Sequence, residues 1–283
     1  MAQRAPNVGK GQEKQQSNMG KRHIAAAVIV AAIIGCNNIP TLKADGIETE
    51  TTTVDTSVCL INNMPPQCHI YMKIKYAKGN NAAKINKAIA ESALFPQDYA
   101  NAAVGNDMEQ RIRNFAQSYI ADYRKELGPL FRADNGQAAL YEKNLRINTS
   151  MKSERGGIIT YTTMLSEIAG DGSATTLTKA TNISLKTARR ITTDDILVHG
   201  SDSFVKKLLC EKLCKKFRAK DMKALRSKGI LCNEDIYIPD NFIIGRRHIT
   251  FIFNSDEIAP HDLGEIRITI DDEELENLLK LKS

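Results

Sequence analysis

The chain lacks the short motifs that mark most hydrolase, metal and nucleotide sites. Its 283 residues contain no HExxH, GxSxG, P-loop or GxGxxG sequence and no tryptophan. Five histidines are scattered along the chain, and those beyond the N-terminal region share no metal-ligand spacing: His69, His199, His248 and His261. The sequence therefore predicts no metal centre and no cofactor, and it favours a protein without catalytic activity.

Apolar runs that reach the roughly 20 residues of a transmembrane helix are also missing. The apolar run 24–35 is shorter and follows Lys21-Arg22-His23, a pattern typical of a secretory signal peptide. It ends at Ile33-Ile34-Gly35-Cys36, which resembles a bacterial lipobox. Residues 1–36 therefore predict export and a lipid anchor on Cys36, facing the periplasm or the cell surface. A plain signal peptide with an incidental cysteine is the alternative, and translation starts at Met1 or Met19.

A strong charge of either sign is absent once this leader is removed. The whole chain carries a net charge of +6, but residues 1–23 contribute +4 of it, which leaves about +2 for the mature protein. A weakly charged mature chain does not favour nucleic acid as a partner.

Cysteines are few and, with Cys36 assigned to lipid, odd in number. Cys59 and Cys68 flank a turn signal, so they can face each other across a hairpin. Cys210 and Cys214 are spaced by one helical turn and are poorly placed to bridge each other, whereas either can pair with Cys232. Export into an oxidising compartment makes all five disulfide candidates.

The pattern of hydrophobic residues predicts an α+β fold in two subdomains, because strands and helices follow each other without strict βαβ alternation. We expect a tether over 37–50, an N-terminal subdomain over 51–135 and a C-terminal domain over 136–283. The expected strands are 51–61, 68–76, 142–155, 157–169, 173–185, 236–238, 242–244, 248–253 and 265–270. The expected helices are 81–94, 107–127 with a stop at Gly128-Pro129, 203–216, 220–227 and 272–281.

Two local patterns bear on chemistry. Ser203-Phe204-Val205-Lys206 matches the SxxK of penicillin-binding enzymes, in which a lysine activates a serine nucleophile, although Ser203 also suits a helix N-cap. The segment 206–228 is rich in lysine and arginine, with Lys215, Lys216 and Lys220 near its centre. It predicts either a surface for an anionic partner or a solvated helix face whose apolar side packs on a sheet. That apolar side would comprise Phe204, Leu208, Leu209, Leu213 and Phe217.

The C-terminal half resembles a known family. The matching segments are 236–242 (IYIPDNF), 249–254 (ITFIFN), 257–260 (EIAP) and 264–266 (GEI), preceded by 181–196. They resemble the extracytoplasmic domain of lysozyme-sensing anti-sigma factors of the RsiV type, which also precedes some peptidoglycan deacetylases and occurs in stand-alone lipoproteins. The resemblance covers roughly 141–281 and implies a ligand-binding loop. The family commonly has aromatic residues at the positions of Phe253, Asp256 and His261, and only Phe253 is aromatic here.

We therefore expect a lipid-anchored protein that binds or senses a partner at the cell envelope. We expect neither an anti-sigma factor nor a deacetylase, because the cytoplasmic or catalytic part of those relatives has no counterpart here. The expected partner is a lysozyme-like muramidase, another envelope protein or a peptidoglycan fragment. The expected ligand-binding residues are Phe253, Asp256, Glu257, His261, Lys215, Lys216 and Lys220. The alternative is a peptidoglycan hydrolase that uses Ser203 and Lys206, or the acid pair Asp256 and Glu257.

Overall fold

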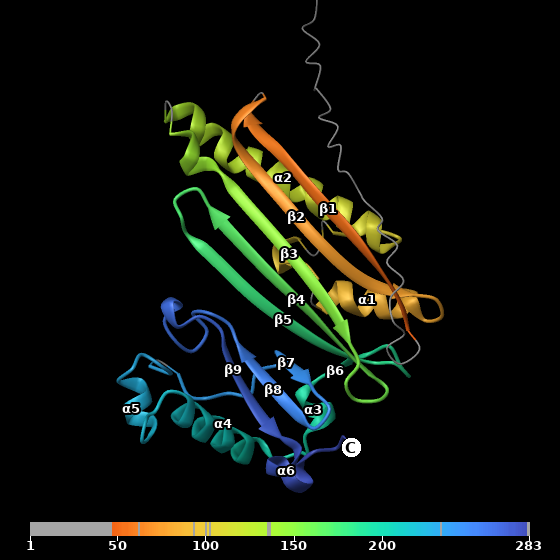
Figure 1. The fold of residues 1–283 in the computed structure, drawn as a ribbon, viewed down its shortest axis with the longest axis vertical. Helices are drawn as coiled ribbons and strands as arrows, with labels where there is room; N and C mark the ends of the chain where they lie inside the picture. Colours follow the sequence, from red (N-terminus) through yellow and green to blue (C-terminus); the bar gives the residue numbers. More distant parts are fainter. Residues whose placement is uncertain are drawn as a thin grey trace, which may run out of the picture.

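The computed structural model describes residues 47–61, 63–92, 94–99, 101, 103–134, 137–232 and 234–281. The expected signal peptide, Cys36 and most of the expected tether lie outside these residues. The described chain has the mixed α+β fold that the sequence predicted, with a six-stranded sheet and a three-stranded sheet (Figure 1).

The larger sheet has its strands in the order of the sequence. Its strands are β1 (Glu48–Ile61), β2 (Met64–Lys78), β3 (Lys143–Lys152), β4 (Ile158–Ala169), β5 (Ala174–Ser184) and β6 (Arg190–Ile191). All neighbouring pairs are antiparallel except β2 and β3, which are parallel. Because β3 pairs directly with β2, this sheet continues across the boundary that we expected between residues 135 and 136.

The connection from β2 to β3 contains two helices, α1 (Ala82–Ser92) and α2 (Met108–Ala133), which cover one face of the larger sheet (Figure 1). Buried aliphatic and aromatic side chains of these helices and of the sheet form one core. Its members include Ile70 and Tyr161 on the strands and Ile89 and Phe115 on the helices. Within the described residues, no helix is both long enough and apolar enough to cross a membrane.

Helix α2 continues through Pro129, so the stop expected at Gly128-Pro129 is wrong. Proline lacks the N–H that would bond to the carbonyl four residues earlier, on Lys125. Lys125 lies on the exposed side of the helix, where water can satisfy that carbonyl. The missing hydrogen bond is therefore tolerated, and the start at Asp107 is well capped, since its carboxylate accepts from the Gln110 N–H at 2.7 Å.

The smaller sheet is antiparallel and comprises β7 (Phe242–Ile244), β8 (His248–Phe253) and β9 (Ile266–Asp271). Four helices belong to the same part of the chain: α3 (Thr193–Ile196), α4 (Asp202–Lys216), α5 (Met222–Arg226) and α6 (Asp272–Leu275). Helix α4 buries Val205, Leu209 and Leu213 in the second core. Phe204 is instead 41% exposed, because the buried stripe begins one position later than we expected.

Two C-terminal elements differ from the sequence prediction. Residues 236–238 belong to neither sheet, and Pro239 after them has no N–H with which to continue a ladder. The helix expected over 272–281 ends at Leu275 and is followed by a short 3₁₀ turn. Tertiary hydrogen bonds replace the helical ones, since the Lys280 N–H donates to the Ile196 carbonyl at 2.7 Å.

The two sheets meet at the part of the β5 edge that β6 leaves unpaired, and Figure 1 shows the smaller sheet beside β5. Side-chain amides of the smaller unit bind the backbone of that edge. The Asn241 amide accepts from the Ala180 N–H and donates to the Thr178 carbonyl, both at 2.8 Å. Asn254 accepts from the Thr178 N–H at 2.7 Å. These side chains complete the edge hydrogen bonds that a further strand would otherwise make.

Candidate functional site

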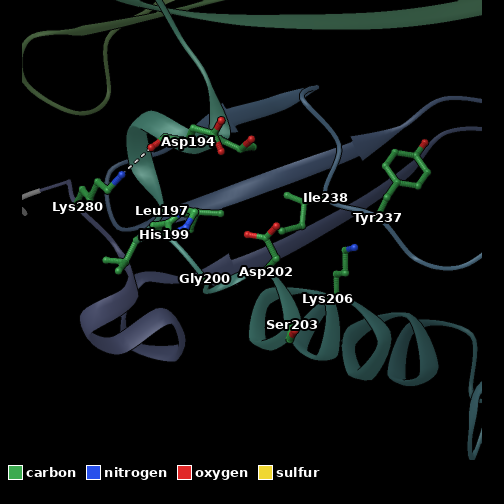
Figure 2. Close-up of a pocket in the computed structure, with 12 residues that line it drawn as sticks. Asp194, Leu197, His199, Gly200, Asp202, Ser203, Lys206, Tyr237, Ile238 and Lys280 are labelled. Atoms are coloured by element: carbon green, nitrogen blue, oxygen red, sulfur yellow. Dashed lines mark hydrogen bonds between the residues drawn. The ribbon is translucent and has the colours of Figure 1, made fainter.

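A pocket of about 780 Å³ opens between α3, the first turn of α4 and the C-terminal segment (Figure 2). We call it the polar pocket. One wall is formed by Thr193, Asp194 and the segment 197–200, and a second by Asp202, Ser203 and Lys206. Tyr237, Ile238 and Lys280 complete it. Its volume lies within the range of pockets that hold small organic ligands.

The first wall is fixed by local hydrogen bonds. The Asp195 carboxylate accepts from the N–H of Thr192 at 2.8 Å and from its hydroxyl at 3.0 Å, which caps α3. These bonds, led by the one from the backbone N–H, hold the pKa of Asp195 below its usual value. The Lys280 ammonium donates to the Asp194 carbonyl at 2.7 Å and ties the C-terminal segment to this wall (Figure 2).

The second wall depends on the turn that leads into α4. Gly200 has a φ of +82°, a left-handed backbone conformation that residues with a side chain rarely adopt. This conformation lets the chain turn into α4. Asp202 and Lys206 are one helical turn apart, and both point from α4 toward the pocket (Figure 2). Neither forms an ion pair within the described part of the chain. Each charge is therefore available to a ligand.

The third wall, formed by Tyr237 and Ile238, is supported by the loop after β8. The Tyr237 hydroxyl donates to the Glu257 carboxylate, and the Tyr237 ring packs edge-on against Phe253 at a centroid distance of 5.6 Å. Burial, and then the hydrogen bond to Glu257, raise the pKa of Tyr237. Tyr237 is therefore a neutral, fixed ring at this side of the pocket.

These walls bring both signs of charge together beside a few apolar side chains. Asp194 and Asp202 supply carboxylates, Lys206 and Lys280 supply ammonium groups, and Leu197 contributes apolar surface. Such a mixture suits a polar ligand that carries both acidic and basic groups. Among the described residues, no three His, Cys, Asp or Glu side chains converge in a way that could hold a metal ion.

The loop residues chosen from the sequence do not line the polar pocket. Phe253 is fully buried in the second core, because its position on β8 faces inward, so its expected role on a ligand surface is wrong. Asp256 and His261 are exposed and bind each other at 2.7 Å. Glu257 lies behind the wall, where it also accepts from the Asn254 N–H at 2.7 Å.

The basic residues chosen from the sequence lie farther along the chain from the pocket. Lys215 and Lys216 end α4, Lys220 follows it, and all three are exposed. They form a solvent-facing basic surface at the opposite end of the helix from Asp202.

The Ser203–Lys206 pair that the alternative hydrolase would use is not assembled in this structure. The N-cap of α4 is Ser201 rather than Ser203. Ser203 is exposed and points away from the Lys206 side chain (Figure 2). No hydrogen bond between the two is present among the described residues, so this geometry does not activate the serine.

The described cysteines are all unpaired. Cys59 and Cys68 do not face each other as we expected, because Cys59 is opposite Gln67 and Cys68 is opposite Val58 in the register. A one-residue offset places them on opposite faces of the sheet. Burial raises the pKa of the Cys68 thiol to about 12. Cys210 and Cys214 are partly buried on α4, and Cys232 is exposed.

A known family model matches the part of the chain that supplies most residues of the polar pocket. Residues 194–273 match the family model described as "Protein of unknown function (DUF3298)". A DUF3298 family member from Bacteroides fragilis has a similar structure, with a TM-score of 0.73 and 21% identity over 84% of this chain and 96% of that one. A DUF3298 family protein from Pseudomonas aeruginosa PAO1 has a TM-score of 0.55 and 11% identity, again over 84% of this chain and 96% of that one. No curated protein matches the chain.

The DUF3298-like region contains Asp194, Asp202, Lys206 and Tyr237, none of which we had chosen as ligand-binding residues. Asp202 and Lys206 share a helix face, which their spacing could have indicated. Lys280 reaches Asp194 only because the chain folds back over 86 residues, and no local pattern signals that contact.

Proposed function

We propose that this chain is an exported, lipid-anchored protein of the cell envelope that binds a peptidoglycan fragment in the polar pocket. The proposed localisation rests on the signal-peptide pattern and the lipobox-like residues that end at Cys36. The binding role rests on the pocket itself, and the likeness to solved DUF3298 structures supports the fold that builds it.

One observation carries this choice of ligand. The pocket presents Asp202 and Lys206, both without an ion-pair partner in the described chain, beside the apolar side chains of Leu197 and Ile238. A muropeptide offers matching groups, because it has carboxylates and an amine on its peptide and the apolar faces of two sugar rings. Charge-assisted hydrogen bonds to such groups are shorter and stronger than neutral ones.

A titration with two ligands tests the proposal. The soluble fragment 40–283 is titrated calorimetrically with a purified disaccharide tetrapeptide and, separately, with a neutral oligosaccharide that has the same sugars but no peptide. We expect the muropeptide to bind at least about tenfold more tightly, a difference of about 1.4 kcal/mol. Equal affinity for both, or no binding by a folded fragment, would contradict the proposal.

The same preparation distinguishes binding from hydrolysis. The proposal is a binding protein, so intact peptidoglycan incubated with the fragment should release no new soluble fragments. Release that disappears in Ser203→Ala would instead support a serine hydrolase.

A protein partner is the second candidate, and the exposure of Lys215, Lys216 and Lys220 favours it. These lysines suit an acidic surface on an envelope protein or on a lysozyme-like muramidase. Reversal of all three to glutamate should then weaken capture of that protein and reduce its dependence on salt. Unchanged capture of lysozyme by the reversed variant would exclude this surface.

A further inference from the structure

A second cavity, of about 320 Å³, lies at the junction of the two sheets. We call it the junction cavity. Its walls come from the loop after α1, from β4 and β5, and from the segments before β7 and after β8. It shares no lining residue with the polar pocket.

One side of the junction cavity is apolar and rigid. Leu94 and Phe95 line it from the loop after α1 and are 1% and 9% exposed. The Phe95 ring stacks on Phe115 of α2 at a centroid distance of 4.3 Å, which fixes its orientation. Leu165 and Leu177 face each other across β4 and β5 and continue this apolar surface.

The polar groups from the smaller unit are already engaged. Asn241 and Asn254 bind the backbone of β5, and Glu257 accepts from Tyr237 and from the Asn254 N–H. The hydrogen bonds of Asn241 and Asn254 hold the two sheets together, and those of Glu257 lie within the smaller unit. These side chains are therefore poor candidates for contacts with a ligand.

Two polar side chains in the junction cavity remain available. Thr163 is 4% exposed, and its hydroxyl oxygen is buried with no hydrogen-bond partner in the described structure. Lys179 is half-buried and forms no ion pair there. Burial, and then the nearby Arg190, lower the pKa of Lys179. A buried hydroxyl without a partner is costly, since an unmade hydrogen bond loses the solvation of that group.

The strand register places these two groups side by side. Thr163 and Lys179 are directly opposite each other on β4 and β5, two residues from the Leu165–Leu177 pair. Side chains two residues apart on a strand share a face, and opposite residues on paired strands are within contact distance. A cation and a hydroxyl therefore lie next to an apolar surface in one cavity.

We propose that the junction cavity binds an aliphatic monocarboxylate. Its carboxylate accepts from the Lys179 ammonium and the Thr163 hydroxyl, and its hydrocarbon chain packs against Leu94, Phe95, Leu165 and Leu177. One cation and one hydroxyl match a single negative charge. A doubly charged phosphate would need more donors to offset its loss of hydration.

Octanoate is the probe. It is titrated calorimetrically, below its own critical micelle concentration, into the full-length protein in detergent. Butyrate tests the contribution of the chain, and octanol tests that of the carboxylate. We expect octanoate to bind at least about tenfold more tightly than either, which corresponds to about 1.4 kcal/mol.

Variants assign the binding to the cavity. Lys179→Met keeps an unbranched side chain and removes the charge, so octanoate affinity should fall at least about tenfold while octanol affinity stays unchanged. Lys186→Met, at an exposed lysine outside the cavity, is the matched control and should bind like the wild type. Thr163→Val keeps the side-chain shape and should also weaken octanoate, which provides a second test if Lys179→Met does not fold. Octanoate affinity within twofold of the wild type in a folded Lys179→Met or Thr163→Val protein would overturn the proposal.

Discussion

The side-chain amide of Asn241 serves as a strand partner for Thr178, since it donates to the Thr178 carbonyl at 2.8 Å while its oxygen accepts from the Ala180 N–H. This contact joins the DUF3298-like region to the edge of the larger sheet. It also forms one side of the junction cavity.

Removal of this amide should open the edge at defined positions. Asn241→Ala leaves the Ala180 N–H and the Thr178 carbonyl without protein partners, so we expect the protein to lose about 1–3 kcal/mol of unfolding free energy. Amide hydrogen exchange should become faster at Ala180. The Thr178 N–H, which donates to Asn254, is the internal control and should stay protected. Unchanged exchange at Ala180 would contradict this role of Asn241.

A buried ion pair ties the turn after β3 to the start of α6. The Arg155 guanidinium and the Asp272 carboxylate lie 2.5 Å apart, and their side chains are 6% and 14% exposed. Arg155 also donates to the Arg246 carbonyl at 3.1 Å. Arg155→Met should lower the unfolding free energy by about 3–5 kcal/mol, because it strands a buried carboxylate.

The matched control is the neighbouring pair Arg247–Glu273, whose side chains are 70% and 80% exposed. Arg247→Met should cost less than about 1 kcal/mol, as exposed ion pairs do. Urea denaturation of both variants measures the difference. Equal losses would show that burial does not set the cost of breaking these pairs.

His261 should give stability a specific dependence on pH. Its hydrogen bond to Asp256, and then the charge of that carboxylate, raise the pKa of His261 above its ordinary value of about 6.5. A raised pKa in the folded state means that the stabilising contribution is complete below pH 6.5 and is lost as the pH rises through the folded-state value.

The wild type should therefore be more stable than His261→Gln at pH 5.5, and the gap in melting temperature should narrow toward pH 8.5. The same His261→Gln change in an Asp256→Asn background, which removes the carboxylate charge, is the control and should show no such narrowing. A difference in melting temperature that does not change with pH would show that the charged His261 imidazolium does not stabilise the fold.

The alternation of side chains along β1 and β2 predicted most of both strands, because buried residues recur with a period of about two. Strand β5 does not keep this period, since residues 180–183 are all buried. The prediction of a helix end at Pro129 was wrong because the exposed Lys125 carbonyl can accept a hydrogen bond from water in place of the missing N–H. Phe253 was chosen from the family resemblance, and it is buried because both faces of β8 are covered from Ile249 to Phe253.

Both cavities depend on contacts that the sequence does not encode locally. The pairing of Thr163 with Lys179 follows from strand register, and Lys280 reaches Asp194 through the path of the C-terminal segment. Glu257, one of the expected ligand-binding residues, forms a hydrogen-bonded support behind Tyr237 and lines the junction cavity.

The central claim is that Asp202 and Lys206 bind a charged cell-wall fragment in the polar pocket. Its most direct test is a calorimetric titration of a disaccharide tetrapeptide into the wild type, Asp202→Asn, Lys206→Met and the control Lys207→Met, which alters the exposed neighbour of Lys206 on α4. We predict that each pocket variant loses about 1.5–3 kcal/mol of binding free energy, as expected for hydrogen bonds to charged groups, while Lys207→Met binds like the wild type. Affinities within twofold of each other for all four folded proteins would contradict the claim.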